Sequence, residues 1–246
     1  MKSHSRIFLT MSLVLLAAGS ALSQTSDSLP SASGVVALMM RGDAERRSEM
    51  TGYTAIRRYV AVNHERRAEM RVRVDCSSDG IKQFTVLSEE GSGSIRKHVF
   101  SKMLSEESDA SRRETRESSR ITPANYEFKM VRQVVLDSGP AYVLEIAPKK
   151  PSKYVVIAKI WVDATDYSVV RIEGQPARNP SFWVHDVHFI HTYQKVGPFW
   201  LASATQSTSE VRIFGSSKLT IESSDYVLNS QKQETSEPEA IASVAR

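Results

Sequence analysis

Apolar and polar residues alternate with a period of two along much of this chain, a pattern typical of strands that are buried on one face only. The clearest run covers residues 69–76, where one face carries methionine and valine and the other carries charge (Met70, Val72 and Val74 against Arg71, Arg73 and Asp75). Asp79 and Gly80 follow it as a hairpin signal. The pattern therefore predicts a chain dominated by antiparallel strands.

Short turn sequences separate the alternating runs, and no crossover helix intervenes among the later ones. This spacing predicts an antiparallel meander of about eleven strands. The expected strands are residues 53–62, 69–76, 82–88, 126–136, 141–147, 153–163, 168–173, 181–194, 199–206, 210–215 and 218–228.

Two segments have a helical pattern instead, residues 34–58 and 95–119. The second has an apolar stripe at i, i+3 and i+4 spacing (Val99, Phe100, Met103 and Leu104), and its second half is almost entirely charged. Asp109 with Arg113, and Arg113 with Glu117, are spaced to pair. We expect either a helix that lies over the mouth of the sheet and docks by its apolar end, or a partly exposed surface helix.

The ends of the chain differ from its middle. Lys2 and Arg6 precede a short apolar run, and small residues at Ala21 and Ser23 suit a cleavage site, so residues 1–23 are predicted to be a secretory signal peptide. The alternative is a membrane anchor, but the run is shorter than the ~20 residues that span a bilayer. Residues 24–33 are expected to form a flexible leader, 34–228 a single domain, and 229–246 a disordered tail.

Composition narrows the choice of partners. The 246 residues are 41% hydrophobic and 24% charged, with a formal charge of +4. Without Lys2 and Arg6 the mature chain is nearly neutral, which argues against a nucleic-acid partner. Cys76 is the single cysteine, so no internal disulfide can form. We expect it half-buried in a strand rather than acting as a nucleophile. In an oxidising compartment a lone thiol could also cross-link two copies.

Three groups of residues could carry chemistry. His185, His188 and His191 would suit a metal on a helix, but on a strand His185 and His191 share a face ~20 Å apart. The acids Asp163, Asp166 and Glu173 flank a predicted hairpin and are expected to serve the turn and a solvated face. The Gly91–Ser94 segment lacks the lysine of a phosphate loop. We therefore expect no catalytic residue, metal or cofactor, and no enzyme activity.

Several stretches, in order, carry a resemblance to a known family. They are residues 53–74, 121–131, 160–174 (IWVDATDYSVVRIEG), 179–203 and 211–226. Together they resemble the LolA-like superfamily of bacterial outer-membrane lipoprotein-sorting proteins, over most of residues 35–228. The resemblance implies an incomplete antiparallel β-barrel of about eleven strands with helices as a lid, an α+β fold with no catalytic residues. It also implies a lid-latching arginine, for which Arg57 and Arg58 are the candidates.

The resemblance further implies a periplasmic carrier or sensor whose apolar inner surface accepts lipid chains, where each buried CH₂ contributes ~0.8 kcal/mol. We expect a monomer that binds lipid or lipoprotein acyl chains, with a membrane-bound donor or acceptor protein. A sensory or scaffold module that binds a protein partner, and a hydrolase on a barrel, remain as alternatives. The candidate lining residues are Val99, Phe100, Met103, Leu104, Trp161, Trp183, Phe189, Phe199 and Trp200.

Overall fold

The computed structural model describes residues 29–64, 66–181, 184–212 and 215–229. The expected signal peptide, Trp183 and all but the first residue of the expected tail lie outside these ranges. In the described ranges, no helix is both long and apolar enough to cross a membrane.

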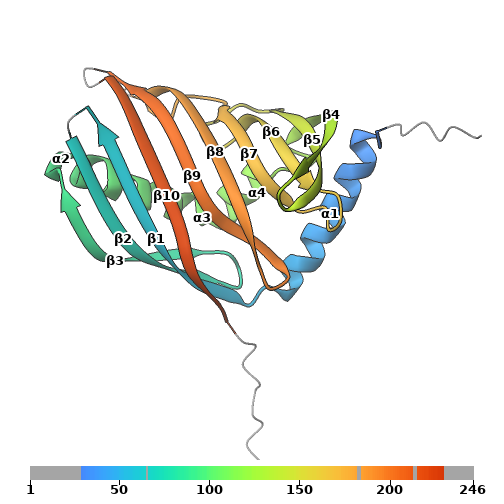
Figure 1. Cartoon of the computed structure of the whole chain (residues 1–246), viewed down its shortest axis with the longest axis horizontal. Helices are drawn as coiled ribbons and strands as arrows, with labels where there is room; N and C mark the ends of the chain where they lie inside the picture. The colour runs from blue at the N-terminus through green and yellow to red at the C-terminus, as the bar shows by residue number, and fades with distance from the viewer. Residues whose placement is uncertain (1–28, 65, 182–183, 213–214, 230–246) are drawn as a thin grey trace, which may run out of the picture.

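The described strands form one antiparallel sheet that follows the predicted meander. They are β1 (Gly52–Asn63), β2 (Arg66–Ser77), β3 (Lys82–Gly91), β4 (Tyr126–Leu136), β5 (Gly139–Pro148), β6 (Val156–Asp163), β7 (Val169–Pro176), β8 (Val184–Val196), β9 (Phe199–Val211) and β10 (Gly215–Leu228). Their order is β3-β2-β1-β10-β9-β8-β7-β6-β5-β4, so β3 and β4 are the edges and the sheet does not close into a barrel. The sheet curves around the helices (Figure 1).

The expectation of eleven strands is corrected to ten. The predicted strand 210–215 does not exist as a separate element, because β9 continues to Val211 and β10 begins at Gly215. Strand β9 pairs with β8 at both of its ends, and the C-terminal part of β9 also pairs with β10. The polar residues near Thr208 suggested that a strand ends there. They do not interrupt β9, because polar side chains are compatible with its hydrated outer face.

Three helical rods accompany the sheet. Helix α1 (Ala32–Glu49) begins at Ser31, whose Oγ accepts from the Gly34 N–H at 3.1 Å. It ends before the predicted 58, because Gly52 adopts φ +104° and starts β1. The second rod is continuous through α2 (Gly93–Ile95), the π-helical turn η1 (Arg96–Phe100) and α3 (Ser101–Ser111).

The predicted helix 95–119 breaks at Arg112, which is extended (ψ 144°), and α4 (Arg113–Ser119) follows. The break changes the expected pairs. Asp109 contacts Arg112 at 3.2 Å, and Glu117 contacts Arg120 at 2.9 Å.

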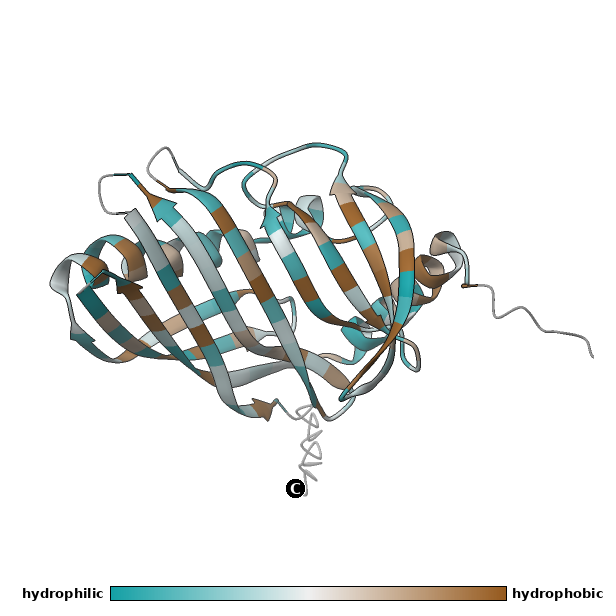
Figure 2. Cartoon of the chain, turned by 45° about the horizontal axis from the view of Figure 1, so that its top comes forward, coloured by the Kyte–Doolittle hydropathy of each residue, from teal (hydrophilic) through white to brown (hydrophobic). Residues whose placement is uncertain are grey.

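The helices all lie on one face of the sheet, here called the inner face. The segment from α2 to α4 carries the chain behind the sheet from the β3 edge towards the β4 side, where α1 also packs (Figure 1). The first three strands and the last seven are thus joined by a helical layer. Figure 2 shows the alternation of hydrophobic and hydrophilic residues along the strands that such a one-sided layer requires.

Two apolar clusters fix the helices to the inner face. Val35, Val36 and Met39 of α1 pack on strands β4 to β7 (Tyr126, Leu144, Ile146, Ala158, Ile160, Val162 and Ile172). At the other end Ile95 and Phe100 pack on β1 and β2 (Tyr59, Ala61, Ala68, Met70, Val72 and Val74). Phe100 is fully buried, with its ring 6.2 Å from that of Tyr59.

Candidate functional site

A single line of directly paired residues crosses the inner face from β4 to β10. Each residue in it is the ladder partner of the next, so their side chains lie side by side on one face. In order they are Phe128, Ile146, Ala158, Gly174, Phe189, Ser207 and Leu219, and we call them the floor row. The row joins seven strands into one line in which Ser207 is the only polar side chain.

The floor row lies along a groove of about 950 Å³. Every lining residue belongs to strands β4 to β10, and none belongs to a described helix. Seven strands at ~4.8 Å spacing give a groove about 29 Å long. This part of the inner face is therefore an open channel beside the helical layer.

Small side chains keep the groove hollow. Ala158 and Gly174 lie between Ile146 and Phe189 in the floor row, and Ser207 lies between Phe189 and Leu219. A Cβ on Gly174 would lie 2.2 Å from the carbonyl oxygen of Ile157, far inside the distance at which non-bonded carbon and oxygen atoms touch. Strands β6 and β7 thus meet so tightly that only glycine fits at this position.

An ion-pair cluster holds α3 to the inner face next to the groove, and we call it the clamp. Glu107 of α3 accepts from Arg57 of β1 at 2.6 Å and from Lys82 of β3 at 2.9 Å. Burial alone would raise the pKa of Glu107, but the charges of Lys82 and Arg57 outweigh it and bring the pKa down to about 2. The carboxylate therefore stays ionised, and both ends of the contact remain charged.

The two candidate latch arginines lie on opposite faces of β1. Arg57 points inward and is buried, while the next residue, Arg58, lies on the opposite face of β1 with 41% of its side chain exposed. Arg58 pairs with Glu69 and Glu222 of neighbouring strands instead. Only Arg57 contacts a helix, so the charged half of the helical segment is docked as well. The expectation that only its apolar end docks is corrected.

His191 lies on the same strand face as Phe189, with the two rings 4.7 Å apart. Its Nδ1 is 2.6 Å from the hydroxyl oxygen of Thr205, its partner on β9. Burial lowers the pKa of His191 to about 4, with smaller contributions from the clamp residues. The imidazole is therefore neutral at pH 7, a polar but uncharged neighbour of the groove.

The other two histidines are placed differently from the expectation. A bulge at Asp186 (φ +50°) shifts the register, so that His185 pairs with Glu210 and His188 with Thr208. His185 and His188 therefore share the outer face, and His185 does not share a face with His191. In the described ranges, no three His, Cys, Asp or Glu side chains converge in a way that could hold a metal ion.

The structure separates the predicted lining residues that it describes, and it does not bring them into one cavity. Phe189 is in the floor row, and Phe199 and Trp200 line a second, smaller pocket. Phe100, Met103 and Leu104 pack on the cluster around Tyr59, whereas Val99 is 39% exposed. Trp161 packs with Val143 and lies 5.1 Å from the Arg171 guanidinium, and neither pocket includes it.

Sequence reasoning favoured aromatic residues and missed the small ones. Ala158, Gly174 and Ser207 carry no signal of their own, since only the strand register brings them into one line. Gly174 was the one available hint, because a glycine within a strand often marks a close backbone approach.

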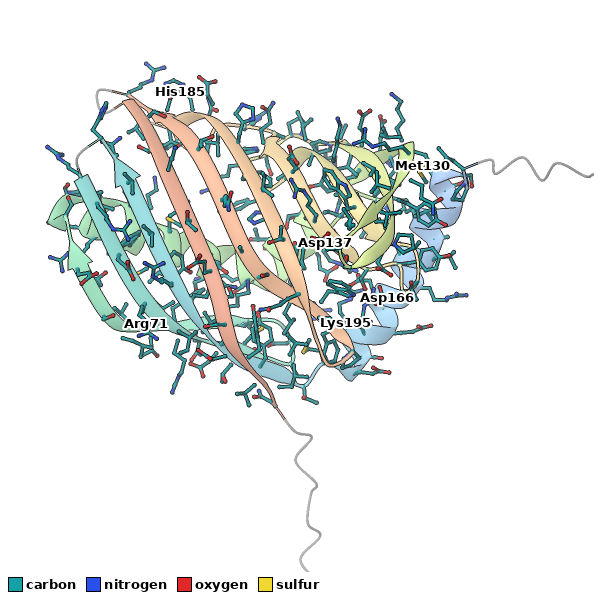
Figure 3. The ribbon with its side chains drawn as sticks, in the orientation of Figure 1. Arg71, Met130, Asp137, Asp166, His185 and Lys195 are labelled. Carbon is teal, nitrogen blue, oxygen red and sulfur yellow. The ribbon has the colours of Figure 1, made fainter. Side chains whose placement is uncertain are left out.

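The second pocket, of about 370 Å³, lies between α1 and strands β7 to β9. Below it, Asp163 and Asp166 shape the β6–β7 turn. Asp163 accepts from the Thr165 and Asp166 N–H groups at 2.8 and 3.0 Å. Asp166 accepts from Lys195 at 3.2 Å and from the Trp200 indole at 2.9 Å, beside α1 (Figure 3). The turn role expected for these two acids is confirmed.

The sequence matches no protein-family model and no curated protein. Among solved structures, the chain is similar to a DUF1329 family protein from Desulfovibrio piger, with 13% identity over 82% of this chain and 94% of that chain and a TM-score of 0.44. It is also similar to a putative outer membrane lipoprotein-sorting protein domain from Vibrio parahaemolyticus (13% identity, 79% and 94% covered, TM-score 0.41). A LolA superfamily protein from Nitrosomonas europaea matches at 9% identity (82% and 95% covered, TM-score 0.39). The superfamily that the sequence resembles is thus among these matches, but similarities this weak leave function to be argued from the chain's own residues.

Proposed function

We propose that this protein binds the acyl chains of a lipid or lipoprotein in the groove along the floor row, as a non-catalytic carrier in the bacterial periplasm. The observation that carries the proposal is the continuous row of mostly apolar residues across seven strands, lying open beside the helical layer. The expected signal peptide would deliver the chain to that compartment.

The dimensions of the groove suit hydrocarbon chains. The apolar core of a bilayer is about 30 Å thick and holds two layers of acyl chains. A groove about 29 Å long can therefore hold one extended chain or two end to end. Its volume of about 950 Å³ is near the upper end of the ~300–1,000 Å³ range of small-molecule sites.

The groove is also chemically undemanding, as a carrier requires. Its floor offers methyl, methylene and phenyl groups, with the hydroxyl of Ser207 as the one polar side chain in the floor row. Binding there would come from burial of CH₂ groups at ~0.8 kcal/mol each, which depends on chain length and not on head group. An open groove permits release without unfolding of the sheet.

The test is binding of a neutral long-chain lipid, monopalmitin, to a variant with a charge in the floor. Ser207→Asp places a carboxylate against any bound chain, a costly burial, so we expect at least tenfold weaker binding. The control is Thr85→Asp, which adds the same charge on the outer face of β3, outside the lining residues. It should bind like the wild type.

Native mass spectrometry of protein purified from its own host identifies what occupies the groove. Co-purifying lipid that disappears in Ser207→Asp but not in Thr85→Asp supports the proposal. Equal binding of monopalmitin by all three proteins, or by none of them, would overturn it.

A second candidate function is recognition of a protein partner, and the edge strand β3 favours it. Val86 and Leu87 are 47% and 52% exposed there, and among the described strands none pairs with the outer side of β3. An exposed apolar edge can accept an added strand from another chain. A stoichiometric protein in the same mass spectra, in place of lipid, would favour this function.

A further inference from the structure

We propose that the second pocket, beside α1, is a separate site for an anionic amphiphile: a phosphate or carboxylate group held by arginines, with a short apolar segment in the pocket. This inference goes beyond the groove and does not depend on it. It rests on the residues that line the pocket and on how their charges are paired.

The floor of the second pocket is apolar and comes from two layers of the fold. Met39, Met40 and Met50 enter from α1 and its end, and the sheet contributes the opposite wall (Val169, Ile172, Tyr193, Phe199, Trp200 and Leu201). A volume of about 370 Å³ is at the lower end of the range for ligand sites. The space therefore fits a short apolar segment rather than a long chain.

The same pocket is lined by three arginines and one carboxylate. Arg46 and Arg47 come from α1, Arg120 follows α4, and Asp43 is the acid. Asp43 is shared between Arg47 at 3.2 Å and Arg120 at 2.9 Å. Arg120 also contacts Glu117 at 2.9 Å. The arginines from two distant parts of the chain are thus gathered around one acid.

Arg46 is the cation that remains for a ligand. Its Nη1 donates to the backbone carbonyl of Asp166 at 3.1 Å, and within the described residues it makes no ion pair. The nearby Asp166 carboxylate is already engaged by Lys195 and by the Trp200 indole. The pocket therefore has an uncompensated positive charge that faces a lining of apolar groups.

Guanidinium groups bind phosphate and carboxylate oxygens through paired N–H donors. A neutral apolar molecule would leave the charge of Arg46 without a partner. A free anion would leave the apolar lining of the second pocket exposed to water. Only a molecule with both parts complements the whole lining. Whether the anion belongs to a lipid head group or to a free ion is decided by the probes below.

The experiment titrates hexyl phosphate, whose short chain suits the second pocket, into the full chain by calorimetry and compares it with hexanol and inorganic phosphate. The wild type should bind hexyl phosphate at least tenfold more tightly than either. Arg46→Gln should weaken this binding about tenfold, the loss expected for one charge-assisted hydrogen bond. Arg41→Gln is the matched control, since Arg41 is exposed on the same helix outside the pocket, and it should bind like the wild type.

Trp200 lines the pocket, so binding should also change the tryptophan fluorescence. If Arg46→Gln does not fold, Arg47→Gln replaces it, because that side chain is 45% exposed. Hexanol or inorganic phosphate bound as tightly as hexyl phosphate, or no effect of the arginine variants, would overturn the proposal. Loss of hexyl phosphate binding in Ser207→Asp would do so too, because the ligand would then lie in the groove.

Discussion

Arg57 and Glu107 join the sheet to the helical layer through a 2.6 Å contact between residues 50 positions apart in the chain. The adjacent arginine, Arg58, makes an equally short contact with Glu69 on the opposite face, where 41% of the Arg58 side chain is exposed. Two consecutive arginines therefore lie in two different environments. This pair of neighbours allows the energetic role of the clamp to be measured.

We expect Arg57→Gln to lower the free energy of unfolding by roughly 3 kcal/mol, because it leaves a largely buried carboxylate with one of its two cations missing. Arg58→Gln should have a much smaller effect, since the Arg58 side chain is 41% exposed and its second partner, Glu222, is 55% exposed. Urea denaturation of both variants makes the comparison. Equal losses would show that the clamp contributes nothing beyond a surface ion pair.

The clamp also predicts a response to strong acid. The pKa of Glu107 is lowered to about 2 in the folded protein, below its ordinary value of 4.5. The stabilisation that follows is complete above pH 4.5 and is lost as the pH falls towards 2. Thermal unfolding of Glu107→Gln should lack this part of the acid response. A variant that remains as acid-sensitive as the wild type over this range would contradict the assignment.

His191 predicts a second loss of stability, over a less acidic pH range. Burial lowers its pKa from 6.5 to about 4, so the unfolded chain takes up a proton before the folded chain does. Stability from this group is therefore lost as the pH falls from 6.5 to 4, by on the order of 3 kcal/mol. His191→Gln should flatten the stability profile over that interval. His188→Gln, exposed on the outer face, should leave the profile as it is.

Gly174 predicts a steric limit in the groove floor. Gly174→Ala places a methyl group 2.6 Å from the Ala158 Cα and should cost about 1–3 kcal/mol by overpacking. Gly93→Ala is the control, because the nearest atom to its Cβ would be a flexible arginine nitrogen at 3.9 Å. Denaturant midpoints of the two variants decide. A stable Gly174→Ala protein would mean that β6 and β7 can separate at this point.

The pattern of alternation was enough to predict the meander, because a sheet covered on one side imposes a period of two on every strand. The helical segment near Phe100 was also predictable, since its apolar stripe has helical spacing. The break at Arg112 was not, because nothing in the local sequence marks it and its position is fixed by contacts of α3 with β1 and β3.

The candidate site was harder to predict than the fold. A bulge at Asp186 reverses the face of His185, and no count of residues along a strand can reveal a bulge. The choice between Arg57 and Arg58 depended in the same way on which face of β1 is inner. The small residues that keep the groove hollow carry no signal one by one. Only the register of the paired strands shows that they lie in one line.

The position of β10 has a consequence for the order in which the protein can fold. This strand is the last in the described chain, yet it lies in the interior of the sheet, between β1 and β9. Until it is in place, three early strands and six later ones have no shared hydrogen bonds. A ribosome must therefore release the chain as far as β10 before the two parts of the sheet can be joined, and truncation near residue 215 would leave two separate sheets instead of one slightly smaller sheet.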